Sequence, residues 1–108
     1  MLSIDFKDLE VSNSGNSSNV FNVDFKRLEV RVLVGNGEIV MRNLNPSPKF
    51  NEIYDISYLN KDNTTNLNIV DKLGAGIDID LVINNAKVKS IEPEHFDNGR
   101  FWVNIKLK

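Results

Sequence analysis

The chain has 108 residues, of which 41% are hydrophobic and 26% are charged, and it carries a formal net charge of −2 without any cysteine. This length suits one domain over residues 1–108, and this composition argues against wholesale disorder. The lack of cysteine excludes disulfides, thiolate metal sites and cysteine nucleophiles, and the slight acidity argues against a dedicated duplex-DNA binder, which usually carries a basic excess.

The first residues alternate between apolar and polar and contain no basic segment followed by a long apolar one, so we expect no signal peptide. No stretch approaches the roughly 18 apolar residues of a membrane span. We therefore expect a cytoplasmic protein of its host cell, or one within a particle assembled there, and no membrane partner.

The N-terminal segment predicts a strand. Apolar residues alternate with polar ones over residues 2–6, which is the period of a half-buried strand. The alternation continues one position out of phase at Leu9 and Val11. Because such a slip needs an extra residue, we expect a β-bulge near Lys7-Asp8.

A short internal repeat follows from the same segment. Residues 4–11 and 23–30 are identical at six of eight positions, and a polar segment over residues 12–19, which we read as a loop, lies between them. The repeat indicates either a duplicated β unit that presents two equivalent edges or two similar strands. The 19-residue offset is too short for a duplicated domain, and two copies are too few for a solenoid.

The middle of the chain carries turn signals. Gly35-Asn36-Gly37 predicts a tight hairpin turn into a strand over Glu38–Arg42, and two prolines predict a loop over residues 43–49.

The next segment is ambiguous. Residues 50–58 fit helical spacing, yet Tyr54, Ile56 and Tyr58 also fit the alternation of a strand, which we favour because these residue types suit strands. Residues 67–73 predict a short strand or a single helical turn.

The last third has the clearest pattern. Apolar residues at 77, 79, 81 and 83 share one face, Asn84-Asn85 can form a two-residue turn with positive φ, and a strand over Ala86–Ile91 follows. Counting outward from this turn places Asp80 opposite Lys89.

After a loop expected over Glu92–Gly99, a final strand points Phe101, Val103, Ile105 and Leu107 toward the core. These elements predict a C-terminal three-strand meander with one buried face. In total we expect an all-β fold of about seven to eight short antiparallel strands, either a small β-sandwich or a β-barrel.

Signals for catalysis are weak. The only histidine, His95, lies among Glu92, Glu94 and Asp97, which could hold a cation but reads more simply as a solvated acidic connection. No nucleophile elbow or phosphate-binding loop occurs. We therefore expect no enzyme, no cofactor and no metal, with a small hydrolase or metal enzyme around His95 as the remote alternative.

The outward face of the final strand is the candidate binding site. It combines the single tryptophan with cations and an amide, and the residues expected there are Arg100, Trp102, Asn104, Lys106, Lys87 and Lys89. Such a stripe suits single-stranded nucleic acid, which stacks on aromatic rings, and it equally suits a protein interface. A third interpretation packs Trp102 under the other sheet of a sandwich, with the lysines at the rim.

We expect a non-catalytic binding or assembly protein that acts through a β surface or an exposed strand edge, with a protein partner or self-association. The frequent asparagines are typical of AT-rich coding sequences and suggest a low-GC bacterium or its phages and plasmids, so we expect a protein of a phage or another mobile genetic element. The alternative is a small β-barrel that binds single-stranded nucleic acid through the tryptophan stripe.

Overall fold

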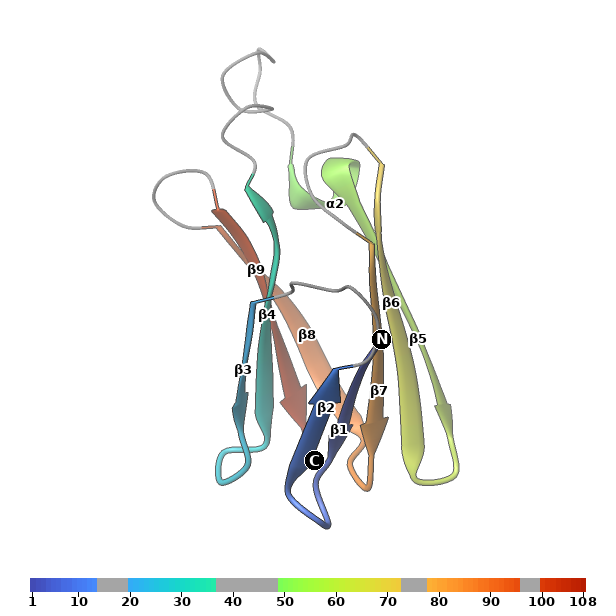
Figure 1. The fold of residues 1–108 in the computed structure, drawn as a ribbon. Coiled ribbons are helices and arrows are strands. Elements are labelled where there is room, and N and C mark those ends of the chain that lie inside the picture. The colour runs from blue at the N-terminus through green and yellow to red at the C-terminus, as the bar shows by residue number, and fades with distance from the viewer. Residues whose placement is uncertain (14–19, 37–48, 73–77, 96–99) are drawn as a thin grey trace.

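Two β-sheets face each other in the computed structural model, which describes residues 1–13, 20–36, 49–72, 78–95 and 100–108 (Figure 1). The first sheet has the strand order β2 (Glu10–Asn13), β1 (Leu2–Asp5), β7 (Ile79–Asn84), β6 (Thr64–Asp71) and β5 (Tyr54–Lys61). The second has the order β3 (Phe21–Asp24), β4 (Glu29–Asn36), β9 (Arg100–Leu107) and β8 (Val88–His95). The predicted all-β sandwich is confirmed, and the described strands do not close into a barrel.

One shared core lies between the sheets, built from the inward positions of both. On β9, Phe101, Val103, Ile105 and Leu107 are at most 5% exposed. The predicted face at 79, 81 and 83 of β7 is equally buried, whereas residue 77 lies outside the described residues. Local alternation was enough to predict these faces, because successive strand residues point to opposite sides. One pairing departs from the expected antiparallel pattern, since β1 runs parallel to β7.

The ambiguous segment contains both predicted structures in succession. Phe50–Ile53 forms a short helical turn, α2, and Tyr54 begins strand β5. The ring of Phe50 packs against Tyr54 at 5.1 Å and against Phe101 at 5.9 Å between ring centroids. Helix α2 therefore fills one end of the sandwich by linking β5 of one sheet to β9 of the other (Figure 1). Burial raises the pKa of the Tyr54 phenol far above its ordinary value.

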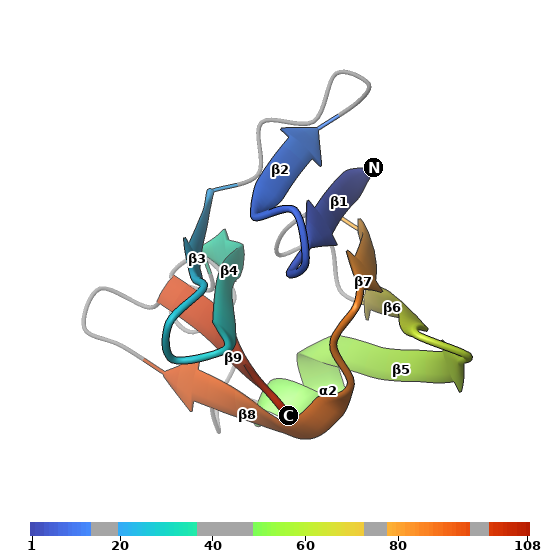
Figure 2. The ribbon, with the colours of Figure 1, turned by 90° about the horizontal axis from the view of Figure 1, so that it is seen from below.

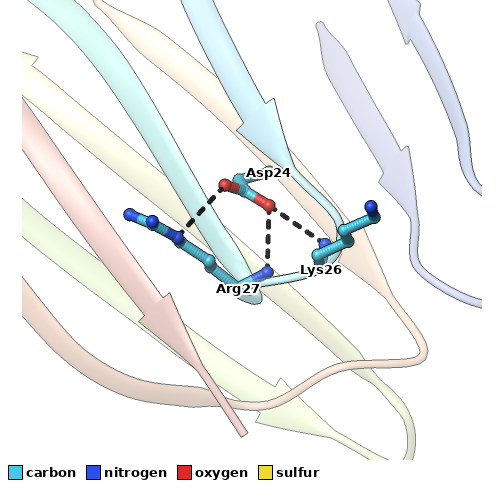
Figure 3. Close-up of polar contacts among 3 residues, drawn as sticks. All are labelled: Asp24, Lys26 and Arg27. Atoms are coloured by element: carbon cyan, nitrogen blue, oxygen red, sulfur yellow. Dashed lines mark hydrogen bonds and ion pairs between the residues drawn. The ribbon is translucent and has the colours of Figure 1, made fainter.

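Each copy of the sequence repeat folds as a β-hairpin with the same turn. In the second copy, Asp24 Oδ1 accepts hydrogen bonds from the backbone N–H groups of Lys26 (3.0 Å) and Arg27 (2.9 Å), as Figure 3 shows. In the first copy, Asp5 Oδ1 accepts the corresponding N–H groups at 2.8 and 3.2 Å. The bulge expected at residues 7–8 is wrong, because an aspartate that binds the backbone ahead of it ends the strand in a turn.

The two hairpins lie in different sheets and meet through their turns. The rings of Phe6 and Phe25 occupy the same repeat position and pack edge to face, with 5.2 Å between centroids. The hairpins supply the edge strands β2 and β3, which Figure 2 shows on the same side of the sandwich. Asn85 Nδ2 also donates to Asp5 Oδ1 at 2.9 Å, and this bond, with the turn N–H groups, lowers the pKa of Asp5.

Each of the two turns holds one leucine in a left-handed backbone conformation, and substitution can test the strain at this position. Leu9 and Leu28 both have φ of 55°, a region that costs a leucine about 1–2 kcal/mol. Leu9 is 60% exposed, so Leu9→Gly should raise the free energy of unfolding by about 0.5–1 kcal/mol in urea titrations. Leu28 packs partly on the core, so Leu28→Gly should lower it instead. Equal effects of the two substitutions would contradict this account.

The predicted C-terminal meander is wrong. Strand β7 belongs to the first sheet, whereas β8 and β9 form a hairpin in the second. Asn85 does have positive φ, at 63°, but buried Ala86 then carries the chain across to the other sheet. Asp80 consequently lies opposite Asn68, whose Nδ2 donates to its Oδ1, and not opposite Lys89. A turn signal predicts that the chain bends, whereas packing decides which strand pairs next.

The remaining predictions concern other segments of the chain, some of which lie wholly or partly outside the described residues. The strand expected over Glu38–Arg42 lies outside them, as does Gly37 of the preceding hairpin turn, whereas Gly35 and Asn36 continue strand β4. The loop expected to begin at Glu92 is wrong in its first part, because β8 continues to His95. Residues 67–71 belong to a strand, as one of the two interpretations held. In the described part of the chain, no helix has the length and apolar character needed to cross a membrane.

Candidate functional site

Trp102 lies on the outer face of the second sheet and not beneath the first. The residues on either side of it, Phe101 and Val103, point into the core, so Trp102, Asn104 and Lys106 point outward along β9. All three are partly buried. The interpretation that Trp102 is covered by the other sheet is therefore wrong, and neighbours on its own sheet provide its burial.

Carboxylates and cations pair across this face. Arg31 of β4 places its guanidinium carbon 4.2 Å from the centroid of the Trp102 ring, and its Nε lies 3.1 Å from Glu94 Oε2 of β8. Lys106 Nζ lies 3.4 Å from Glu92 Oε2. An arginine over an indole ring is a favourable cation–π contact. The face is thus a mixed-charge surface and not the basic stripe that we expected.

Asn104 lies in the middle of the same surface, with Arg31 and Glu92 as its cross-strand neighbours. Its Oδ1 is buried and has no hydrogen-bond partner among the described residues. This oxygen is an energetic weak point of the surface, because a buried acceptor without a donor costs free energy.

The remaining cations of the predicted stripe lie at the ends of β8 and β9. Lys87 is exposed in the connection before β8, where its carbonyl accepts the N–H of Lys108 at 2.8 Å. Lys89 is exposed at a β-bulge, where the register with β9 shifts between Val88 and Ser90. Arg100 begins β9, but its side chain lies outside what the structure describes, as does that of His95. The structure thus brings together Trp102, Asn104 and Lys106 on one face of β9, and no described side-chain contact links Lys87 or Lys89 to them.

Sequence reasoning missed the two residues that hold Trp102. Arg31 alternates with buried Val30 and Val32, so its outward direction could be read from the sequence. Its place beside Trp102 could not, because β4 and β9 are about 70 positions apart in the chain. Glu94 lies in the segment that the sequence predicts as a loop. No group of three or more histidine or acidic side chains in the described residues could hold a metal ion.

A second surface feature is the exposed edge of β5. The described strands leave four edges, and three of them are short or interrupted: β2 and β3 have four residues each, and β8 contains Pro93 and a bulge. Short strands, prolines and bulges are the devices that protect sheet edges from unwanted pairing. Strand β5 has eight residues, no proline, no glycine and an unbroken register with β6.

The backbone of β5 presents a regular row of hydrogen-bonding groups at this edge. The carbonyl of Ile53 accepts the N–H of Lys72 at 2.8 Å, so odd-numbered positions of β5 direct their N–H and C=O groups toward β6. The even positions Ile56, Tyr58 and Asn60 direct theirs outward. Among the described residues, no backbone group pairs with them.

Apolar side chains accompany this edge. Tyr58 is 50% exposed and Leu59 is 65% exposed, and they lie on opposite faces of the strand. A groove of about 320 Å³ on the outer face of the first sheet adjoins them, and its lining includes Ser57, Leu59, Asn68 and Val82. The edge therefore combines unpaired backbone groups with apolar contact area on both faces.

A comparison with protein-family models, with curated proteins and with solved structures found no match to this chain.

Proposed function

We propose that this chain is a non-catalytic protein-binding module that accepts an extended segment of a protein partner as an added strand beside β5. The observation that carries the proposal is the contrast among the four described sheet edges: three carry protective features, whereas β5 is long, regular and partly apolar. An unprotected edge is a template for strand addition.

The chemistry of such recognition follows from the strand. Outward N–H and C=O groups at Ile56, Tyr58 and Asn60 would provide affinity through main-chain hydrogen bonds, which any extended segment can make. Selectivity would come from alternating side chains, with Tyr58 on one face and Leu59 on the other. The preferred partner segment is therefore extended and places apolar residues on both faces.

The mixed-charge surface around Trp102 supports the nucleic-acid alternative less well. Single-stranded nucleic acid needs an accessible aromatic face and cations that are available to phosphates. Here Arg31 covers the ring and also meets Glu94, and Lys106 meets Glu92. Two carboxylates at the same place would repel a phosphate backbone.

The proposal is tested by panning a display library of random eight-residue peptides on the protein and on Tyr58→Pro. Proline removes an outward N–H at residue 58 without removing a bond to β6, so β5 should remain folded. We expect wild type to enrich extended peptides that Tyr58→Pro binds at least about tenfold more weakly, corresponding to the ~1.4 kcal/mol of one hydrogen bond.

Two further variants serve as controls. Tyr58→Ala keeps the N–H and removes only the ring, so it should retain part of the affinity. Ser57→Pro removes an N–H that faces β6, so it should lower thermal stability where Tyr58→Pro does not. Peptides that bind Tyr58→Pro as well as wild type, or the enrichment of none, would overturn the proposal.

A further inference from the structure

The edge of β5 is complementary to the same edge of a second copy of this chain, which identifies a partner. This pairing rests on the proposed strand addition. We infer that β5 pairs antiparallel with β5 of a second copy of this chain, about a two-fold axis at Tyr58. The two copies would then share one continuous sheet, with the same residues contributed by each, as two-fold symmetry requires.

The backbone restricts the register of this pairing. Because only even-numbered residues direct their N–H and C=O groups outward, an antiparallel pair must place even residues opposite even residues. Two such registers pair the largest number of β5 residues, one centred on Tyr58 and one centred on Ser57.

Charge decides between these two registers. Centring on Tyr58 places Asp55 opposite Lys61 of the second copy, and the symmetry repeats this pair at the other end. Centring on Ser57 instead places Asp55 opposite Leu59 and Lys61 opposite Ile53, which leaves both charges without an opposite charge across the strands. Asp55 is 70% exposed; its 3.5 Å contact with Lys72 is an exposed ion pair that leaves the carboxylate accessible.

Apolar contacts fit the same register. The Tyr58 rings of the two copies lie opposite each other on the inner side of the sheet. On the outer side, Leu59 of each copy lies beside Ser57 of the other, at the wall of the groove. The two most exposed apolar side chains of β5 would therefore both be covered by the pairing.

The test is a charge exchange followed by sedimentation equilibrium over a wide range of protein concentration. We expect wild type to form dimers, and Lys61→Glu and Asp55→Lys to weaken dimerisation at least tenfold each, because each places like charges opposite one another twice. The double variant with both exchanges should dimerise as wild type does. An equimolar mixture of the two single variants should form the mixed dimer, in which both charge pairs are restored.

Different results would contradict the β5 pairing and the proposed function. Dimers that persist unchanged in Lys61→Glu and Asp55→Lys, or a mixture that remains monomeric, overturn the β5 register. A wild type that is monomeric at every concentration overturns self-pairing, and the peptide panning then decides the proposed function alone. If Tyr58-dependent peptides are still enriched, strand addition stands with a different partner.

Discussion

Replacing Phe101 by alanine should lower the free energy of unfolding by about 3–5 kcal/mol, the usual cost of removing a buried aromatic ring. Phe101 is only 2% exposed and holds the aromatic cluster together, with its ring centroid 5.9 Å from Phe50 and 5.8 Å from Tyr54. Its loss would leave a cavity where α2 joins the two sheets. A domain of this length has about 5–15 kcal/mol of stability in total, so the loss is a large fraction.

Urea unfolding monitored by circular dichroism measures the effect. Phe101→Leu is the matched control, because it keeps an apolar side chain in the cluster and loses mainly the ring contacts, at a cost of about 1–2 kcal/mol. The denaturant slope should not change, since the same surface is exposed on unfolding. Equal losses for both substitutions would contradict the role of the aromatic cluster.

Replacing Ile4 by alanine should cost about 2–5 kcal/mol, and the repeat supplies its control. Ile4 lies on β1 and is fully buried between β2 and β7. Val23 holds the same position in the second copy, but β3 is an edge strand and Val23 is only partly buried. Val23→Ala should therefore cost about 1 kcal/mol.

Thermal and urea unfolding of the two variants compare the copies directly. The cost of Ile4→Ala should exceed that of Val23→Ala by more than the extra methylene of isoleucine accounts for. Ile4→Val measures the contribution of that methylene and should cost about 0.5–1.5 kcal/mol. If Val23→Ala lowers the free energy of unfolding as much as Ile4→Ala does, then Val23 is packed as tightly as Ile4. That result would contradict the position of β3 at a sheet edge.

The candidate site shows how far local patterns reach. The sequence predicts that Tyr54, Ile56 and Tyr58 belong to a strand, and the structure confirms it for β5. It does not predict that β5 lies at a sheet edge. Whether a neighbouring strand lies beside β5 depends on how all the other strands pair. In the same way, the outward direction of Trp102 follows from alternation with buried neighbours, whereas Arg31 reaches its ring only through the pairing of β4 with β9.

Local patterns predict the β class and the inward faces of the last strand and of β7, because successive strand residues alternate between the two faces of a sheet. The repeat also predicts that its two copies fold alike, although not that each copy is a hairpin with an aspartate turn. The pairing of distant strands could not be predicted in this way: β7 lies in the other sheet from β8 and β9, β1 runs parallel to β7, and β5 is an edge among the described strands. These pairings depend on which distant segments bury each other's apolar faces. They are set by the apolar surface that the whole chain removes from water, which no local pattern of residues specifies.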